Sequence, residues 1–94
     1  RKSDLAARIG GEEFVLLLPN TDIGGAYSMA IEIQEDVEKM EIQLKSSPPF
    51  QFTISGGVST FLFENDHEID QVLHRADKAL YKAKENGKNK IIIC

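Results

Sequence analysis

The pattern of apolar and polar residues differs from one part of the chain to the next, and the pattern of residues 5–18 predicts a β-hairpin. Residues 14–18 are a continuous apolar run of strand length, as is typical of a strand that is covered on both faces. Residues 5–9 form a second strand-like segment, and the four residues between the two begin with Gly10 and Gly11. Two strands joined in this way predict a hairpin. Pro19 ends its second strand because proline has no N–H to donate to a ladder.

The next stretch has the periodicity of a helix. Its apolar positions recur at intervals of three and four, which predicts an amphipathic helix of about six turns. These positions are Ile23, Ala26, Ala30, Ile33, Val37, Met40 and Leu44. Asn20, Thr21 and Asp22 offer N-cap oxygens at its start, and the Ser-Ser-Pro-Pro string at residues 46–49 ends it in a loop.

The remaining chain predicts a strand, a helix and a strand. Residues 50–63 are rich in β-branched and aromatic residues, and Gly56-Gly57 marks a bulge or a close approach of another backbone. A second amphipathic helix has apolar positions at Ile69, Val72, Leu73, Ala76, Leu80 and Ala83, and Asn86-Gly87 signals its end. Three isoleucines at residues 91–93 predict a last short strand. This order predicts an α/β fold, a two-layer sandwich with a ferredoxin-like sheet.

Composition narrows the class of protein. The 94 residues support one modest core, and 41% apolar with 28% charged residues is typical of a globular domain. A net charge of −4 argues against a nucleic-acid partner. The single cysteine, Cys94, allows no internal disulfide and fits a reducing compartment. No apolar run approaches the ~20 residues of a membrane span, and the start at Arg1 rather than Met suggests a piece of a longer chain.

Basic residues concentrate near the C-terminal end. Residues 75–90 carry six basic and two acidic side chains, whereas residues 32–41 and 64–70 are acidic. Lys84 and Lys88 have two explanations. They are lysines favoured by the negative end of a helix dipole, or they are point-charge contacts to a polyphosphate.

The hairpin tip is the clearest candidate for chemistry. Glu12 and Glu13 are adjacent carboxylates beside Gly10 and Gly11, whose missing side chains let a bulky ligand approach the main chain. Adjacent carboxylates suit a hard cation such as Mg²⁺, and one of them could accept a proton from an attacking hydroxyl. Taken alone, the string is short and common, and an exposed acidic turn is the simpler interpretation.

The ends of the chain offer weaker candidates. Arg1 and Asp4 could together bind a guanine or a phosphate, but taken alone they are better explained as part of a frayed, charged terminus. His67 and His74 lack the spacing of metal ligands or of a triad. Ser55 has no His–Asp pattern near it and is therefore not predicted to be a nucleophile.

Three strings together resemble the GGDEF family, the diguanylate cyclases. Residues 7–14 (ARIGGEEF) match its signature in the GGEEF form, residues 53–59 (TISGGVS) its next strand, and residues 75–89 (RADKALYKAKENGKN) its C-terminal helix. They occur in the family order and spacing and cover essentially the whole chain. The resemblance implies a nucleotidyl-cyclase-palm-like sheet and the condensation of two GTP into cyclic di-GMP, by an antiparallel homodimer with Mg²⁺ or Mn²⁺.

The resemblance also implies roles for residues. Glu12 and Glu13 match metal ligands, and Glu13 is the candidate base for the ribose 3′-hydroxyl. Gly10 and Gly11 match glycines that leave room for the nucleotide.

Basic residues of the family match as well. Lys84 and Lys88 correspond to triphosphate contacts, with Arg8 a further one. Arg1 and Asp4 match the RxxD of the family's product-inhibition site.

The same resemblance indicates what precedes this sequence. The family domain begins before Arg1, with a strand that completes the metal site and helices that bind guanine. Residues 1–94 are therefore expected to be the C-terminal part of one GGDEF domain, inactive alone, which lies in the cytoplasm whether or not its parent is membrane-anchored. An upstream sensor or receiver domain is expected in the parent.

The sequence leaves three further expectations, on product inhibition, on an alternative function and on exposed surfaces. Glu32 stands where some members add an arginine to the inhibition site, and a carboxylate there would repel an anionic dinucleotide. The alternative function is that of a degenerate receptor that binds cyclic di-GMP or GTP without turnover. Loss of the first strand would also expose two sheet edges and apolar helix surface.

Overall fold

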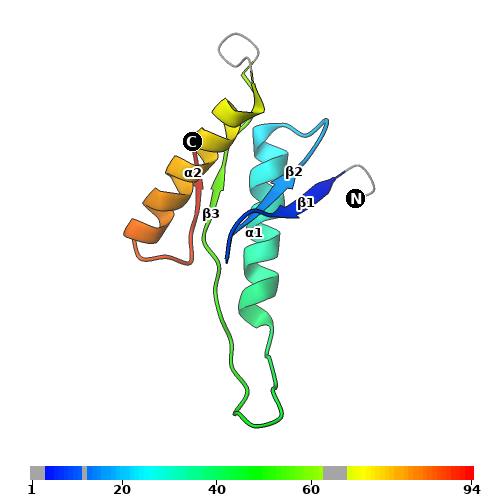
Figure 1. Ribbon diagram of the computed structural model, residues 1–94, viewed down its shortest axis with the longest axis vertical. Coiled ribbons are helices and arrows are strands. Elements are labelled where there is room, and N and C mark those ends of the chain that lie inside the picture. The colour runs from blue at the N-terminus through cyan, green and yellow to red at the C-terminus, as the bar shows by residue number, and fades with distance from the viewer. Residues whose placement is uncertain (1–3, 12, 63–67) are drawn as a thin grey trace.

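A computed structural model describes residues 4–11, 13–62 and 68–94 of the chain. Its elements are the strands β1 (Leu5–Arg8) and β2 (Phe14–Leu17), the helix α1 (Ile23–Lys39), the strand β3 (Gly56–Val58), the helix α2 (Ile69–Glu85) and the strand β4 (Ile91–Ile93). This is the predicted order of hairpin, helix, strand, helix and strand, and the α/β class is confirmed (Figure 1).

The strands of the described chain form two small sheets rather than one. β1 pairs with β2 in antiparallel fashion, with Arg8 opposite Phe14, and β3 pairs with β4 in parallel, with Gly56 opposite Ile91. The backbones of both helices lie close to β3 and β4, whereas the backbones of β1 and β2 lie close to no other described helix or strand. The predicted sandwich is therefore present around β3 and β4, and the hairpin stands apart from it.

The core lies where α2 crosses β3 and β4. The buried apolar residues are Val58, Ala79, Ala83 and Ile91. A Cβ at Gly57 would collide with the carbonyl oxygen of Ala76 in α2. The predicted close backbone approach at the glycines is thus confirmed at Gly57, where only glycine lets the helix lie directly on the strand.

Local signals set the ends of both helices. Asp22 is the N-cap of α1, and its Oδ1 accepts the Gly25 N–H at 2.7 Å, as predicted. α2 begins after Glu68, whose N–H donates to the Gln71 side chain at 3.1 Å, and it ends before Asn86. The predicted bounds of the second helix are therefore confirmed.

The first helix is shorter than its periodicity predicts. It ends at Lys39 instead of continuing to Leu44, because the chain turns extended at Met40. Ile42 then pairs with Phe50 through two backbone hydrogen bonds of 2.8 and 2.9 Å, which hold residues 40–50 out of the helix. The predicted strand over residues 50–63 is likewise wrong among the described residues 50–62, where only Gly56–Val58 forms a strand, and residue 63 lies outside the described part of the chain.

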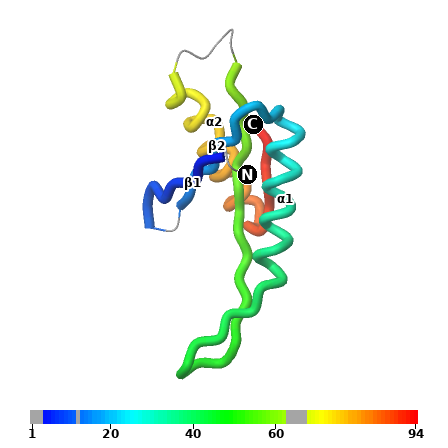
Figure 2. Tube along the Cα trace, turned by 90° about the vertical axis from the view of Figure 1, so that its right-hand side faces the viewer, coloured from blue at the N-terminus to red at the C-terminus, as the bar shows by residue number. Residues whose placement is uncertain are grey.

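The molecule is elongated. Its longest dimension is 52 Å, because residues 40–55 extend beyond the end of α1 (Figure 2). The radius of gyration of 14.7 Å exceeds the about 12 Å expected of a compact chain of this length. β2 reflects this openness. Phe14 is 70% exposed, so the expectation that both faces of this strand are covered is wrong for this chain.

Candidate functional site

The tip of the β1–β2 hairpin is held by its own backbone. The Ile9 N–H donates to the Glu13 carbonyl at 3.0 Å, so Glu13 stands directly before β2 and is held by a hydrogen bond across the turn. Its carboxylate lies over Gly10, where an added Cβ would be 3.8 Å from Oε1. A Cβ at Gly11 would meet no atom within 4 Å. Contacts within the described fold therefore do not require glycine at position 11.

Arg8 orders the same turn. Its Nε donates to the carbonyl oxygens of Gly10 at 3.2 Å and Gly11 at 3.0 Å, and its Nη2 donates to Gly11 at 2.7 Å. The guanidinium thus gathers the two carbonyls of the Gly-Gly step to one side. The resemblance singled out Arg8 as a further phosphate contact, and that role stays a prediction; in the structure its guanidinium orders the turn.

Lys84 of α2 reaches the hairpin tip. Its Nζ lies 3.8 Å from Oε2 of Glu13, and both side chains are 40% exposed. A pair this exposed contributes little to stability. Its significance is spatial, because it brings a predicted triphosphate contact next to the predicted base.

Lys88 lies in the turn that follows α2. Its N–H donates to the Ala83 carbonyl at 2.9 Å, which together with Gly87 at φ 107° forms a Schellman-type end to the helix. Lys88 lines the same cleft as Glu13, Lys84 and Asp77. Asp77, Lys84 and Lys88 therefore line this cleft together, whereas Tyr81 of the same helix is exposed.

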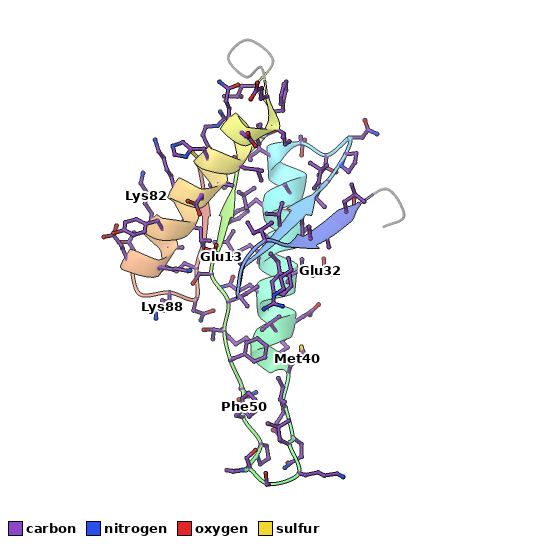
Figure 3. All side chains as sticks on the ribbon, viewed as in Figure 1. Glu13, Glu32, Met40, Phe50, Lys82 and Lys88 are labelled. Carbon is purple, nitrogen blue, oxygen red and sulfur yellow. The ribbon has the colours of Figure 1, made fainter. Side chains whose placement is uncertain are left out.

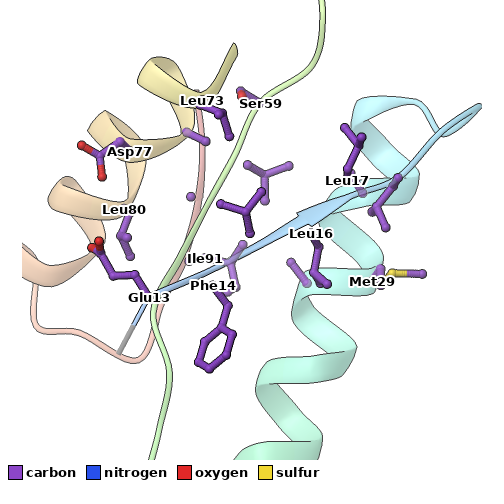
Figure 4. Close-up of a pocket in the computed structure, with 18 of the residues that line it drawn as sticks. Glu13, Phe14, Leu16, Leu17, Met29, Ser59, Leu73, Asp77, Leu80 and Ile91 are labelled. Atoms are coloured by element: carbon purple, nitrogen blue, oxygen red, sulfur yellow. The ribbon is translucent and has the colours of Figure 1, made fainter. Parts of the chain in front are cut away.

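The cleft itself is long and mostly apolar. It has a volume of about 1970 Å³ and is lined by β2, α1, the chain around β3, and α2 (Figure 4). Its helical walls include residues of the apolar stripes predicted from periodicity, such as Ile33 and Leu80, together with Met29, which was not part of the predicted stripe. Pockets for small ligands measure about 300–1,000 Å³, so the cleft is too large for one such ligand. Glu13, Lys84 and Lys88 give it a charged region near the C-terminal end of α2.

The residues that could bind a metal ion lie at the hairpin tip. Glu13 supplies the hard oxygen donors that Mg²⁺ and Mn²⁺ accept. Among the residues that the structure describes, no group of three or more His, Cys, Asp or Glu could hold a metal ion. Glu12, the second predicted ligand, lies outside the described residues. The donor chemistry therefore fits a hard cation, and the described residues supply part of its site.

The predicted inhibition site is only partly in view. Arg1 lies outside the described residues, and Asp4 is half-buried just before β1. Glu32 is exposed on α1 (Figure 3). His67, which was given no role, also lies outside the described part.

Sequence reasoning missed two residues beside the site. Asn89 follows Lys88 and has a left-handed backbone, with φ 50°. Ser55, dismissed as a nucleophile, accepts the Asn89 N–H at 3.0 Å. An asparagine shortly after a helix-ending glycine was the available signal, because asparagine tolerates left-handed conformations better than most residues.

Comparisons with known proteins identify the family of the chain. The family model described as "Diguanylate cyclase, GGDEF domain" matches residues 1–90. The chain is 46% identical over 92 residues to diguanylate cyclase DgcM of Escherichia coli strain K12, covering 98% of this chain and 21% of that protein.

Two solved structures are similar over nearly the whole chain. The active GGEEF domain of a diguanylate cyclase from Vibrio cholerae is 33% identical, with a TM-score of 0.81, over 96% of this chain and 55% of that one. The GGDEF domain of DgcB from Caulobacter crescentus in complex with c-di-GMP is 27% identical, with a TM-score of 0.90, over 99% of this chain and 54% of that one. The chain thus spans about half the length of these structures. Of the curated relative it spans about a fifth.

Proposed function

Because this chain belongs to the GGDEF family of diguanylate cyclases, we propose that it forms part of a catalytic domain that condenses two GTP molecules into cyclic di-GMP. One observation carries the proposal. The Glu13 carboxylate and the Lys84 ammonium lie 3.8 Å apart, on elements far apart in the sequence. A base for a hydroxyl and a cation for phosphates are thus held within reach of one nucleotide.

In the proposed reaction, Glu13 is the group that accepts a proton. In our proposal its carboxylate accepts the proton of a ribose 3′-hydroxyl, whose oxygen bonds to the α-phosphorus of the second GTP as pyrophosphate leaves. Glu12 and Glu13 are the proposed ligands of Mg²⁺ or Mn²⁺, which when bound would neutralise phosphate charge. Pairing of Glu13 with Ile9 fixes where this carboxylate stands.

The basic residues are proposed to hold the triphosphate. Lys84 and Lys88 line the charged region of the cleft and offer two point charges. Gly10 and Gly11 leave space above the main chain, which the open surroundings of Gly11 support. Arg8 keeps the carbonyls of that step gathered, so that they do not obstruct an anion.

The partners follow from the product. Cyclic di-GMP contains two GMP units, so we propose that two complete domains meet antiparallel, each with one GTP. Arg1 and Asp4 are the proposed site for product inhibition, and the DgcB domain with c-di-GMP is a relative that binds this dinucleotide. Since GTP is a cytoplasmic nucleotide, we place the domain there, downstream of a sensor or receiver module. No helix in the described part of the chain is long and apolar enough to cross a membrane.

We further propose that residues 1–94 are the C-terminal part of one domain, and that an upstream strand fills the large cleft. Within the described chain, β2 pairs only with β1 and β3 only with β4, so each keeps one edge free for a neighbour. The cleft that both strands line has apolar walls and exceeds the size of a ligand pocket. A buried strand between them would satisfy the free edges and cover the apolar stripes of both helices.

The test uses the complete protein with GTP and Mg²⁺, and detects cyclic di-GMP by mass spectrometry. We expect product from the wild type, none from Glu13→Gln, and wild-type amounts from Glu35→Gln, a matched change on the exposed surface of α1. Full activity of Glu13→Gln would overturn the assigned base. A folded wild type that binds cyclic di-GMP or GTP but forms no product would establish the receptor function instead.

A further inference from the structure

The turn after α2 has an unusual backbone. Gly87, Lys88 and Asn89 have φ values of 107°, 61° and 50°, so three consecutive residues are left-handed. Glycine adopts this conformation freely and asparagine tolerates it, but lysine has no such preference. The helix-ending bond from the Lys88 N–H to Ala83 accounts for Gly87. Something beyond the helix end must hold Lys88.

Asn89 is held on every polar side. Its backbone N–H donates to Ser55 Oγ at 3.0 Å, and its Nδ2 donates to Glu38 Oε2 at 2.9 Å. The Gln34 Nε2 donates to both the backbone carbonyl of Asn89 at 2.8 Å and its Oδ1 at 3.0 Å. We call these four residues the Asn89 network. It ties the turn to α1 and to the chain before β3.

The network leaves Lys88 little freedom. On one side, α2 ends with hydrogen bonds to Lys82 and Ala83, and on the other, Lys90 accepts the Gly56 N–H at 2.9 Å. Lys88 lies between these fixed points, so the direction of its side chain is set by its own φ and by Asn89. That direction keeps Lys88 in the wall of the cleft that Glu13 and Lys84 also line.

We propose that Asn89 is a positioning residue for the triphosphate of GTP: through Gln34, Glu38 and Ser55 it holds Lys88 in the left-handed conformation that keeps this lysine in the wall of the cleft. The inference rests on the proposed function of Lys88. Asn89 itself touches no substrate in this scheme, and its effect passes entirely through Lys88.

The side-chain chemistry supplies a specific test. The Asn89 amide gives a hydrogen to Glu38 and takes one from Gln34. In the pair Asn89→Asp with Glu38→Gln, the amide and the carboxylate exchange places, so the same two bonds can form again. Glu38→Gln alone keeps an oxygen that can accept from Asn89.

The experiment measures KM for GTP and kcat in the complete protein. We expect Asn89→Ala to raise KM about tenfold with kcat within about twofold, as for loss of one charge-assisted substrate contact. The exchanged pair should have a KM within about threefold of the wild-type value, and Glu38→Gln alone should also have a KM within about threefold of that value. Asn20→Ala is the matched control, because Asn20 is also left-handed, with φ 54°, in the turn before α1. It should leave KM unchanged.

A double-mutant cycle with Lys88→Ala separates positioning from general damage. If Asn89 acts through Lys88, Asn89→Ala adds nothing to the KM of Lys88→Ala. An additive effect, or no effect of Asn89→Ala beside a raised KM for Lys88→Ala, would overturn the inference while leaving the proposed function intact. An unchanged KM for Lys88→Ala overturns the proposed role of Lys88, and the inference with it. If Asn89→Ala fails to fold, Asn89→Gly, which keeps left-handed freedom, takes its place with the same expected outcomes.

Discussion

The β1–β2 hairpin and the unit formed by β3, α2 and β4 each contain two paired strands, yet only the second has a core. In that unit Ile91 is 8% exposed and Ala83 is fully buried, whereas Phe14 on the hairpin is 70% exposed. The difference lies in what covers each sheet. Two helices pack on β3 and β4, and the large cleft lies beside β2. The hairpin carries the proposed base, and the core unit carries the lysines.

The contrast shows how the proposed site divides its tasks. The core unit places Lys84 and Lys88 through α2, which is anchored by close packing on Gly57. The hairpin places Glu13 through backbone pairing and the Arg8 contacts alone. A weak ion pair between Glu13 and Lys84 joins the two regions. Each region can therefore be perturbed separately.

The largest effect is expected from Gly57→Ala, which attacks the core unit. The added Cβ would collide with the backbone of α2, so we expect a loss of about 3 kcal/mol in the free energy of unfolding. Denaturant unfolding of the complete protein measures it. The matched control is Gly24→Ala in the first turn of α1, where a Cβ meets only Asp22 Oδ1 at 3.6 Å. It should stabilise by about 0.5–1 kcal/mol, and equal losses at both sites would contradict the packing argument.

The second prediction compares one apolar truncation in each region of the 94-residue chain. Ile91→Ala should cost about 2–4 kcal/mol because it leaves a cavity in the core. Phe14→Ala should cost under about 1 kcal/mol, since most of its ring is already in water.

The same pair of variants tests whether an upstream strand fills the cleft. In the complete protein the cost of Phe14→Ala should rise to about 3 kcal/mol, because a covered phenylalanine is lost. The cost of Ile91→Ala should stay the same. If Phe14→Ala is equally mild in both forms of the protein, the proposed strand does not cover β2.

The third prediction separates ligand space from stability at the hairpin tip. Gly11→Ala should leave the melting temperature unchanged, because its Cβ meets no atom within 4 Å. Cyclic di-GMP formation should fall about tenfold or more, equivalent to about 1.4 kcal/mol, as the methyl group enters the space proposed for the nucleotide. Normal turnover with normal stability would show that this space is not used.

The smallest effect is expected where the two regions meet. Lys84→Gln should change the free energy of unfolding by less than about 0.5 kcal/mol, because the pair with Glu13 is exposed. The melting temperatures of variant and wild type should differ little, and this difference should be about the same at low and at high salt. A loss of several kcal/mol would mean that this contact holds the hairpin in place, which its exposure does not predict.

Much of the fold could be read from the sequence because its signals are local. The hairpin follows from a Gly-Gly turn between two strand-like segments, and α2 from its periodicity and the Asn86-Gly87 end. The candidate site was reached through Glu13, Lys84 and Lys88, whose residue types and motifs suit metal and phosphate chemistry. The hairpin and α2 depend on residues only a few positions apart, and the chemical groups of the site depend on residue type. Neither the two elements nor these groups need the rest of the chain to be predicted.

Tertiary structure decided what depends on distant partners. α1 stops at Lys39 because Ile42 pairs with Phe50, and periodicity within a helix contains no information about that pair. Arg8 donates to the turn carbonyls, contacts that the resemblance, which suggested a phosphate contact, did not indicate.

Asn89 is the clearest case. Its partners Gln34 and Ser55 lie 55 and 34 positions away in the sequence. The sequence by itself determined the local elements and the chemical groups of the site. The structure determined which groups face one another, because hydrogen bonds and packing between distant segments form only once the chain is folded.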